Sequence, residues 1–241
     1  MQPDEIQLRP AVPADLGTIA DLFLAARAAA VPKMPPVARP DEDVRAHFAA
    51  WDLTRRDVWV ASDESGLTAF ASLEESWLDS LYVAPVRARS GIGSALLDVV
   101  KSLRPDGFAL WVFESNLPAR AFYARHGLVE LEHTDGSDNM ERSPDLRMAW
   151  GGADPMAYFR SEIDDVDRLL AVLLSRRAAL TAAIQPHKPV AGHAGRDAER
   201  EREIAERMSA HAPGLGPDAL HRIMHTVIAE SLDAWESGDG G

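Results

Sequence analysis

Four cationic residues are spread along the last third of the chain: Arg160, Arg177, Lys188 and Arg200. Arg177 lies in a run whose apolar residues recur in steps of three and four, which predicts the seam of an antiparallel bundle or coiled coil. The apolar positions of this seam are Phe159, Ile163, Val166, Leu170, Leu173, Leu180 and Ile184. Because burying an unpaired charge is costly, we expect an anion to meet Arg177 there. The alternative is an arginine whose head group reaches solvent or pairs with a glutamate of a partner chain.

The helix predicted over residues 155–185 is too long for the short sequence after it to cover. At 1.5 Å per residue it would extend about 45 Å. A second copy could cover its apolar stripe, so we expect a homodimer through the C-terminal helices. Arg160 and Arg177 are 17 residues apart and mark opposite ends of the helix. In an antiparallel dimer, Arg160 of one chain would approach Arg177 of the other, and four cations meeting in one cavity would suit a small dicarboxylate.

A basic, glycine-containing turn joins a predicted strand to a predicted helix in the first half of the chain. The strand ends with Leu81 and Val83, and the turn and helix start contain Arg87, Arg89, Ser90, Gly91, Gly93 and Ser94. Glycines at a helix start let backbone N–H groups approach and hold a phosphate, assisted by the helix dipole. An ordinary tight turn is the alternative. A second segment favours phosphate binding: Asn116, followed by Phe122 and Tyr123.

Together these two segments resemble the GNAT family of acyl-CoA N-acetyltransferases, over roughly residues 5–150. The resemblance implies that the turn binds the pyrophosphate of acetyl-CoA and that Asn116 and Tyr123 belong to a second CoA motif. It also implies direct attack of an amine on acetyl-CoA, with Tyr123 as the general acid that protonates the leaving thiolate. Tyr123 could instead be an ordinary core residue. The family's usual Arg or Gln before the first glycine is replaced by Ala88.

The sequence names neither the amine acceptor nor the general base of such a reaction. Glu74, Glu75 and Asp79 lie on or beside the strand expected to face the acceptor, and a base could also act through water. The acidic character of this half fits a cationic amine but leaves its identity open.

The C-terminal region resembles the all-helical (AroQ-type) chorismate mutase family, over about residues 156–235. The run of residues 160–167 matches the opening signature of that family. Further residues then follow in the family's register without a gap: Arg177, Lys188, Asp197, Arg200 and Glu201. The resemblance implies conversion of chorismate to prephenate, a step of the shikimate pathway to aromatic amino acids.

By this resemblance, Arg177 and Arg160 of the partner subunit would hold the carboxylates of chorismate. Arg200 would orient the substrate, with Asp197 and Glu201 contacting its hydroxyl group. The rearrangement needs no cofactor and no proton transfer. Catalysis would select the compact chair conformer and stabilise the charge that grows on the ether oxygen.

Two positions depart from the family pattern. Pro186 should end or kink the long helix before Lys188, which by the resemblance would hydrogen-bond the ether oxygen. On the last helix Ser231 faces inward, and the next inward position is Trp235, where the family usually has Gln or Glu. Ser231 and Trp235 are therefore candidate substrate-binding residues, although Trp235 could equally be core. We expect weak mutase activity, or activity that depends on a partner.

Other interpretations of the helical region stay open. It could be a non-catalytic module for dimerisation or chorismate sensing, or an isochorismate-pyruvate lyase that uses the same cations. The charged run around Arg200 is by itself typical of a solvated helix face. His221 and His225 are one turn apart, a spacing that can mark a metal site. No third ligand is evident in the sequence, and we expect no metal.

Composition limits the remaining possibilities. The chain has 241 residues, a net charge of −13 and no cysteine, which excludes disulfides, thiolate nucleophiles and cysteine-based metal sites. The acidic charge argues against a general nucleic-acid binder. No apolar run reaches the roughly 18 residues of a membrane span, and residues 1–10 lack the pattern of a signal peptide. The expectation is a cytoplasmic protein without a membrane partner.

Two scaffolds must position these residues. We expect an α/β acetyltransferase sheet with flanking helices over residues 1–152, and an all-α three-helix domain that forms an intertwined dimer over residues 153–241. Strands are predicted at 6–9, 58–61, 68–73, 77–83, 108–113, 128–131 and 146–150. Helices are predicted at 14–29, 41–50, 94–102, 117–126, 155–185, 197–211 and 217–235. The near-continuous apolar run 108–113 predicts a strand buried on both faces.

Overall fold

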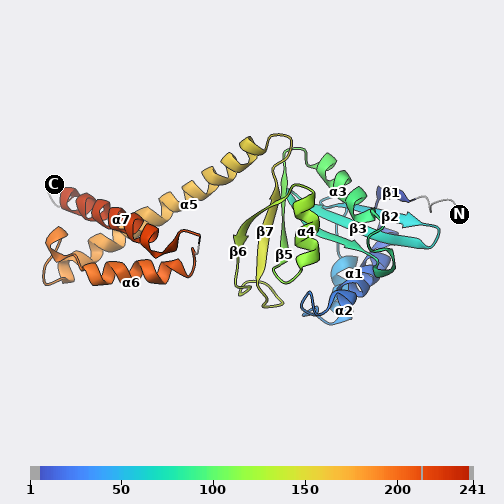
Figure 1. Ribbon diagram of the computed structural model, residues 1–241, viewed down its shortest axis with the longest axis horizontal. Coiled ribbons are helices and arrows are strands. Elements are labelled where there is room, and N and C mark those ends of the chain that lie inside the picture. The colour runs from blue at the N-terminus through green and yellow to red at the C-terminus, as the bar shows by residue number, and fades with distance from the viewer. Residues whose placement is uncertain (1–5, 213, 239–241) are drawn as a thin grey trace. The chain divides into compact units, whose positions relative to one another are not determined.

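The computed structural model describes residues 6–212 and 214–238, so the ends of the two predicted domains, at residues 1 and 241, lie outside it. It contains two compact units, Met1–Arg160 and Ser161–Gly241 (Figure 1). The long helix α5 (Pro155–Ile184) runs across this division. The domain boundary between residues 152 and 153 stays a prediction. Over the described ranges, the structure has no helix that is both long and apolar enough to span a bilayer.

The first unit is built on one mixed sheet. In the described part of the chain it has seven strands, in the order β1-β2-β3-β4-β5-β7-β6 (Figure 1). Neighbouring strands are antiparallel except for the parallel pair β4 and β5. The strands are β1 (Gln7–Pro10), β2 (Asp57–Asp63), β3 (Gly66–Glu74), β4 (Trp77–Val83), β5 (Phe108–Phe113), β6 (Val129–His133) and β7 (Asp145–Trp150).

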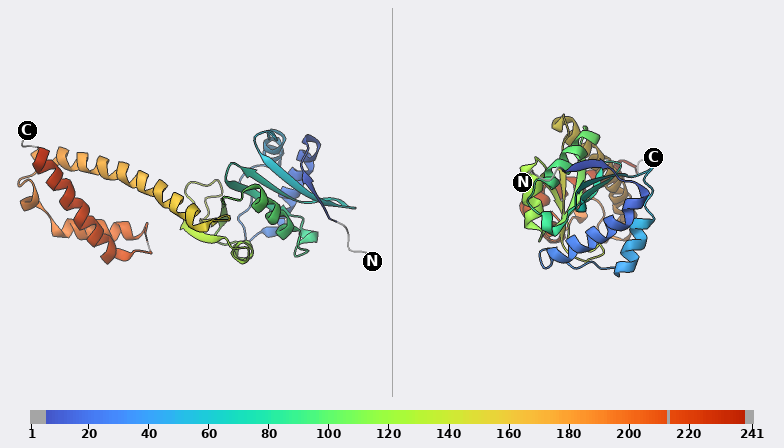
Figure 2. Two further views of the ribbon diagram at one scale, coloured as in Figure 1. Left: turned by 90° about the horizontal axis from the view of Figure 1, so that it is seen from above. Right: turned by 90° about the vertical axis from the view of Figure 1, so that its right-hand side faces the viewer.

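Helices cover this sheet in two layers (Figure 2). The four helices of the layers are α1 (Leu16–Ala30), α2 (Asp41–Ala49), α3 (Ile92–Leu103) and α4 (Leu117–Arg125). Against one face, α1 and α2 bury Ile19 and Phe48 with Phe70 of β3. Against the other, α3 buries Leu96 in a cluster that also contains Tyr123 of α4. The amphipathic periods in the sequence are satisfied by these two layers.

The prediction that β5 is buried on both faces is wrong at Trp111. That side chain is 45% exposed, whereas Phe108 and Leu110 of the same strand are at most 2% exposed. The cluster under α1 and α2 draws its strand residues from β2, β3 and β4, so β5 lies outside that cover. Trp111 instead stacks on Trp77 of β4, with ring centroids 6.3 Å apart and planes 5° from parallel. An apolar run can therefore contribute an exposed aromatic side chain as well as core residues.

In its described residues the second unit contains three α-helices, as predicted: the C-terminal part of α5, then α6 (Ala198–Ser209) and α7 (Gly216–Gly238). Gln185–His187 and His193–Gly195 form short 3-10 turns between α5 and α6. Pro186 ends the α-helix before Lys188, as its missing N–H requires. α6 and α7 pack together and bury Ala205, Leu220 and Leu232.

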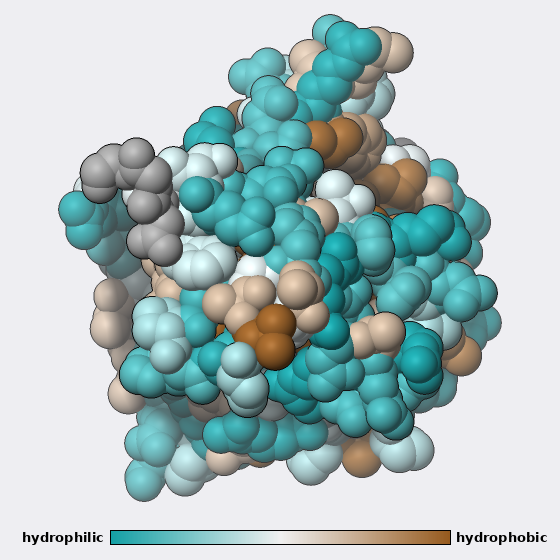
Figure 3. All heavy atoms as spheres, turned by 90° about the vertical axis from the view of Figure 1, so that its left-hand side faces the viewer, coloured by the Kyte–Doolittle hydropathy of each residue, from teal (hydrophilic) through white to brown (hydrophobic). Residues whose placement is uncertain are grey.

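Within the chain, α5 has no buried residue. Its exposed apolar side chains are Met156, Ile163, Val166, Leu169, Leu170, Val172, Leu173, Leu174, Leu180 and Ile184, each between 38% and 66% exposed. Figure 3 shows a face of the molecule on which brown hydrophobic side chains lie open between teal hydrophilic ones. The seam predicted from sequence is present on α5, and a single chain leaves it uncovered.

Candidate functional site

A cleft forms where β4 and β5 separate. Among the described residues these parallel strands are joined at one pair, Trp77 with Ala109. A cavity of about 830 Å³ lies between them, lined by residues 78–83 of β4 and 110–113 of β5. Two strands that were hydrogen-bonded along their whole length would leave no room for a ligand between them. The separation of β4 and β5 therefore creates the cavity.

The glycine-containing turn lies at one end of the cavity. Gly91 caps α3 with φ of 87°, in the left-handed region that L side chains rarely adopt. Gly93 follows on the first turn of α3, and a Cβ added there would lie 3.6 Å from Val83 Cγ2, an ordinary contact. Arg89 also has a positive φ, of 65°, despite its side chain. The turn thus presents the N-terminus of α3 to the cavity.

The two arginines that flank Ala88 have different surroundings. Arg87 forms an ion pair with Asp63, at 2.6 Å between Nη2 and Oδ2. Arg89 is exposed at the cavity edge. Arg89 is therefore the more available cation for an anionic ligand, because the guanidinium of Arg87 already has an acidic partner.

Asn116 and Tyr123 are positioned by α4. Asn116 is the N-cap of that helix, and its Oδ1 accepts a hydrogen bond from the backbone N–H of Ala119 at 3.3 Å. Tyr123 lies on the same helix, seven residues after Asn116. It is 8% exposed and lines the cavity. Burial raises the pKa of its phenol well above the ordinary 10.0, and nearby Tyr82 raises it further. Tyr123 is therefore protonated at neutral pH and can act as a proton donor.

The structure brings all ten residues of the predicted cofactor-binding set into the lining of this one cavity. They are Leu81, Val83, Arg87, Arg89, Ser90, Gly91, Gly93, Ser94, Asn116 and Tyr123. Ser94 is also in contact with a histidine of α4, with 3.0 Å between its Oγ and His126 Nε2. That these residues bind a cofactor stays a prediction.

Several cavity residues were not singled out from the sequence, notably Tyr82, Trp111 and Asp145. Tyr82 is partly buried, and desolvation raises the pKa of its phenol. Asp145 accepts hydrogen bonds from Thr134 Oγ1 and from Asn139 Nδ2, the latter at 3.0 Å. The available signal was position: Tyr82 and Trp111 lie in the two strands whose ends flank the turn.

In the helical unit, Arg177 occupies a partly desolvated position. Its Nη1 donates to Ser231 Oγ of α7 at 3.2 Å. Burial lowers the pKa of Arg177 and the charge of Glu201 partly opposes this. Among residues 6–212 and 214–238, no carboxylate forms an ion pair with Arg177. The cation is thus held beside Ser231, without a neutralising carboxylate from the described part of the chain.

The arm between α5 and α6 carries Lys188, whose Nζ donates to the carbonyl of Gly195 at 2.8 Å. Gln185 fixes the start of this arm: it is 2% exposed, and its Oε1 accepts from the N–H of Gly192 at 2.9 Å. Trp235 lies against the same arm, since a Cβ added to Gly192 would lie 3.5 Å from its ring. Trp235 therefore supports the arm as well as standing at a predicted substrate position.

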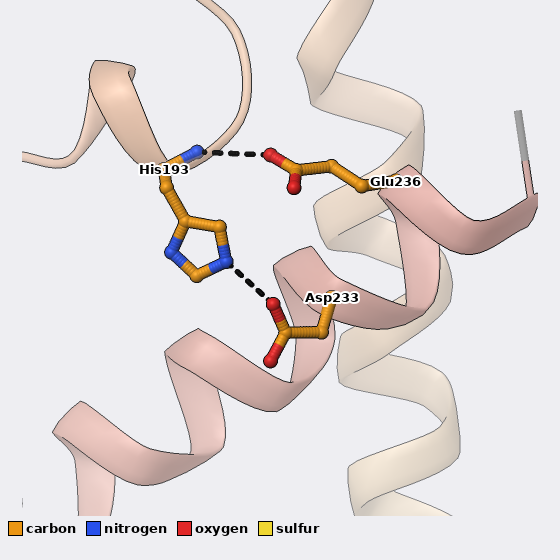
Figure 4. Close-up of side chains that lie close together, drawn as sticks. All are labelled: His193, Asp233 and Glu236. Atoms are coloured by element: carbon orange, nitrogen blue, oxygen red, sulfur yellow. Dashed lines mark hydrogen bonds and ion pairs between the residues drawn. The ribbon is translucent and has the colours of Figure 1, made fainter.

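His193, Asp233 and Glu236 tie the arm to α7 (Figure 4). The Nε2 of His193 lies 2.7 Å from Asp233 Oδ1, and its backbone N–H donates to Glu236 Oε1 at 3.2 Å. The ligand atoms of the three residues lie within 4.8 Å of one another, close enough to hold a metal ion. All three are exposed and already bonded to each other, which suits a structural clasp.

The acidic residues of α6 already have partners within the chain. Glu201 is 6% exposed and receives two hydrogen bonds from Arg196, at 2.8 and 2.7 Å. These bonds lower the pKa of Glu201. Asp197 caps α6 by accepting from the N–H groups of Glu199 and Arg200, both at 3.0 Å. From the sequence, Asp197 and Glu201 were both predicted to contact the substrate, and Arg196 was missed. The spacing of residues along the chain does not show which side chains pair across a turn.

The remaining predicted residues are exposed. Arg200 lies 3.7 Å from Glu203 on the outer face of α6, and Arg160 is exposed on α5 in the first unit. One chain therefore brings Arg177 and Ser231 together, while it gives Lys188, Asp197 and Glu201 contacts of their own. Their common role in one site stays a prediction.

The fold of the first unit is that of the GCN5-related N-acetyltransferases. Residues covering 63% of the chain superimpose on 99% of such an enzyme from Rhodopseudomonas palustris, with a TM-score of 0.52 and 23% identity. YjaB from Escherichia coli gives a TM-score of 0.51, with 21% identity over 62% of this chain and 99% of that one. At this identity the likeness shows the fold alone.

Two family models match the sequence itself. The acetyltransferase (GNAT) domain matches residues 54–130, and chorismate mutase type II matches residues 159–234. The chain thus contains a GNAT domain followed by a chorismate mutase type II domain, which confirms both resemblances and their order. The peptidyl-lysine N-acetyltransferase YiaC of Escherichia coli is 37% identical over 70 residues, or 29% of this chain. The match spans 47% of YiaC, about half its length.

Proposed function

We propose that the chain is a bifunctional enzyme: an acetyl-CoA-dependent N-acetyltransferase in its first domain and a chorismate mutase in its second. The observation that supports the first activity is the cavity between β4 and β5, with the Gly91–Gly93 turn at one end and Tyr123 in its wall. The observation that supports the second is Arg177, a partly desolvated cation that forms no ion pair with a carboxylate of residues 6–212 and 214–238.

In the acetyltransferase reaction, backbone N–H groups at the start of α3 would hold the pyrophosphate of acetyl-CoA. Arg89 would add a positive charge at the cavity edge and so compensate for Ala88, which replaces the family's usual Arg or Gln. An amine would attack the thioester carbonyl carbon directly. As the C–S bond breaks, the protonated Tyr123 would give its proton to the leaving thiolate.

Isothermal titration calorimetry with acetyl-CoA tests this assignment. We expect binding with micromolar-scale affinity. Failure of acetyl-CoA to bind the unmodified protein would mean that the change at Ala88 has disabled the site. The acceptor would be an amine. YiaC is named as a peptidyl-lysine N-acetyltransferase, and we propose another class of amine for this chain below.

In the mutase reaction, Arg177 and Arg160 of the partner subunit would hold the two carboxylates of chorismate. Lys188 would stabilise the negative charge on the ether oxygen as the C–O bond breaks. Arg200 would orient the substrate, with Asp197, Glu201, Ser231 and Trp235 around its ring. Lys188 would have to exchange its hydrogen bond to the Gly195 carbonyl for the substrate, which is in line with weak mutase activity. Activity that depends on a partner is the alternative.

The uncovered stripe on α5 supports a homodimer. Full burial of one large apolar side chain contributes about 1.5–3 kcal/mol, and α5 leaves ten such side chains exposed. A second α5 would cover them and bring Arg160 to the site. Light scattering should give twice the chain mass, and Leu170→Asp with Leu173→Asp should give a monomer. A monomeric unmodified protein would contradict the dimer.

Two other activities of the helical domain use the same cations. It could sense chorismate without converting it, or cleave isochorismate to pyruvate and salicylate. Incubation of the pure protein with chorismate and with isochorismate, followed by product identification, distinguishes all three. Prephenate supports the mutase, salicylate with pyruvate supports the lyase, and binding without product supports the sensor.

A further inference from the structure

A second cavity adjoins the first at the bulge of β4. It has a volume of about 450 Å³ and is lined by Glu74, Glu75, Trp77, Leu78, Asp79 and Trp111. Leu78, Asp79 and Trp111 line both cavities. The register between β3 and β4 shifts here: Leu73 pairs with Leu78 and Ser72 with Ser80, so Asp79 is skipped. The bulge turns Asp79 out of the ladder and into the boundary between the two cavities.

The lining of this second cavity is acidic and aromatic. Three of its six residues, Glu74, Glu75 and Asp79, carry carboxylates, and two are the stacked tryptophans Trp77 and Trp111. Arg56 donates to Glu74 and, at 2.7 Å, to Asp79, which neutralises part of that charge. Glu75 carries a further exposed carboxylate in the β3–β4 turn. A pocket with this lining attracts organic cations through both charge and aromatic faces.

The stacked pair of Trp77 and Trp111 already contacts a cation of the protein. The guanidinium of Arg147 lies 5.3 Å from the ring centroid of Trp77. Trp111 is 45% exposed, so an aromatic surface stays open beside it. The same chemistry that holds Arg147 would hold the ammonium group of a ligand against Trp111.

The position of this cavity fits the path of an amine to the thioester. The phosphate-binding turn follows Val83, and Asp79 lies four residues earlier on β4. At about 3.3 Å per residue these positions are roughly 13 Å apart. If the pantetheine arm of acetyl-CoA followed β4 from the turn, it would approach Asp79, which lines both cavities. An acceptor that arrives through the second cavity would then meet the thioester beside Asp79.

We propose that the amine acceptor is a small aliphatic diamine or polyamine, which rests on the proposed acetyltransferase function. One amine reaches the thioester beside Asp79, and a second ammonium group remains among Glu75, Trp77 and Trp111. The volume of the cavity suits a short chain rather than a folded protein segment. A monoamine would leave the acidic end without its cation.

The chemical step balances as follows. The leading ammonium loses one proton to solvent through Asp79, and its nitrogen lone pair forms the N–C bond to the thioester carbon. The C–S bond breaks, and the thiolate takes a proton from Tyr123. The second proton lost by the nitrogen returns Tyr123 to its neutral form. The products are the N-acetyl amine and the free thiol of CoA, with one proton released.

The test compares 1,4-diaminobutane with butylamine, which has the same chain length but one charge. Acetyl transfer by the full chain is followed by release of the CoA thiol. We expect kcat/KM to be at least about tenfold higher for the diamine, chiefly through a lower KM. Glu75→Gln should reduce this ratio toward one. The matched control Glu64→Gln, an exposed acid of the β2–β3 turn, should preserve the ratio.

Equal use of the two amines, or a ratio unaffected by Glu75→Gln, would overturn the diamine proposal. So would transfer to a blocked lysine peptide without transfer to the diamine. In each of these three cases the acetyltransferase function would stand, because acetyl transfer would have been observed. Failure of acetyl-CoA to bind by calorimetry would instead overturn the function and the acceptor together. Bound acetyl-CoA with no transfer to either amine would overturn the acceptor alone.

Discussion

α3 and α5 are both amphipathic by sequence, yet their apolar side chains have different surroundings. On α3, Ile92, Leu96 and Val100 are at most 2% exposed because they pack against the sheet. On α5, no side chain is buried, and Leu169 and Val172 are each 66% exposed. The same periodic pattern therefore predicts that a helix face will be covered without saying whether its own chain covers it.

The two candidate sites differ in the same way, in how many of their predicted residues one chain brings together. Around α3 and α4, ten predicted residues line one cavity of a single chain. On α5, Arg177 has one hydrogen-bonded neighbour from α7, and other predicted ligands are bonded elsewhere. The predicted cofactor-binding residues thus line one cavity of a single chain, whereas the proposed mutase site would need a second chain. Each prediction below tests one side of this contrast.

The largest effect is expected from Arg177→Ala. Loss of a charge partner that is desolvated in the complex costs about 3–5 kcal/mol, which would lower mutase kcat/KM by about 10²- to 5 × 10³-fold. Arg176→Ala, which changes the exposed neighbouring arginine, is the matched control. The dimer should survive, since the alanine removes a desolvated cation. A fall of several degrees in Tm would instead indicate a structural ion pair with a partner chain.

Mixing subunits sharpens the same test. Heterodimers of Arg160→Ala and Arg177→Ala chains would hold one intact site and one site with both changes. Activity should partly return once subunit exchange has been verified by mass spectrometry. An absence of rescue after proven exchange would contradict a site shared between chains, and acetyl-CoA binding should be unaffected throughout.

The next effect concerns Tyr123→Phe. A general acid contributes about 10²- to 10⁴-fold to rate, so kcat for acetyl transfer should fall within that range while acetyl-CoA affinity is kept. Tyr82→Phe, at the other, partly buried cavity tyrosine, should cost less. Equal losses for both variants would show that Tyr123 is a packing residue.

The raised pKa of Tyr123 also predicts a pH dependence of stability. Because burial raises its pKa in the folded state above the ordinary 10.0, the contribution of the neutral phenol to folding is fully present below pH 10. It is lost as the pH rises further toward the folded-state pKa. The Tm of the unmodified protein should therefore fall more between pH 9 and pH 11 than that of Tyr123→Phe.

A smaller effect is expected from Gly93→Ala. The added Cβ fits in ordinary contact with Val83, Phe122 and Leu81, so the fold should be preserved. It would occupy space beside the N–H groups at the start of α3, and the Kd for acetyl-CoA should rise about tenfold, or about 1.4 kcal/mol. Gly17→Ala on α1, where a Cβ meets open space, is the matched control. Unchanged affinity would place the pyrophosphate elsewhere.

The smallest effect concerns Asp197 of the helical unit. Asp197→Ala removes the N-cap of α6 and should cost about 1 kcal/mol, which lowers Tm by about 4–8 °C for a unit of this size. Asp197→Asn keeps an acceptor oxygen and should restore both Tm and mutase activity. If the asparagine restores only Tm, Asp197 acts on the substrate through its charge.

The order of elements could be predicted from the sequence because each depends on local pattern. Residues 77–83 and 108–113 were placed as strands with the observed bounds. The end of α5 follows from Pro186, which lacks a backbone N–H. Glycines at 91 and 93 located the start of α3, since Gly91 adopts a backbone conformation that L side chains avoid.

Contacts between distant segments could not be predicted in this way. The pairing of Arg87 with Asp63, of Arg56 with Asp79, and the exposure of Trp111 all depend on which strands become neighbours. Arg196 and Gln185 likewise acquire their roles only when the arm folds back on itself. Nothing in their local sequence distinguishes them from other polar residues.

By itself, the sequence determined the two domains, their order and the residues that resemble known motifs, because periodicity, turn chemistry and spacing are local properties of the chain. Only the tertiary structure decided where β4 and β5 part, that Asp79 lines two cavities, and that the described part of the chain leaves α5 without a buried residue. Those outcomes depend on packing between segments far apart in sequence, where burial and charge pairing are settled by which surfaces meet.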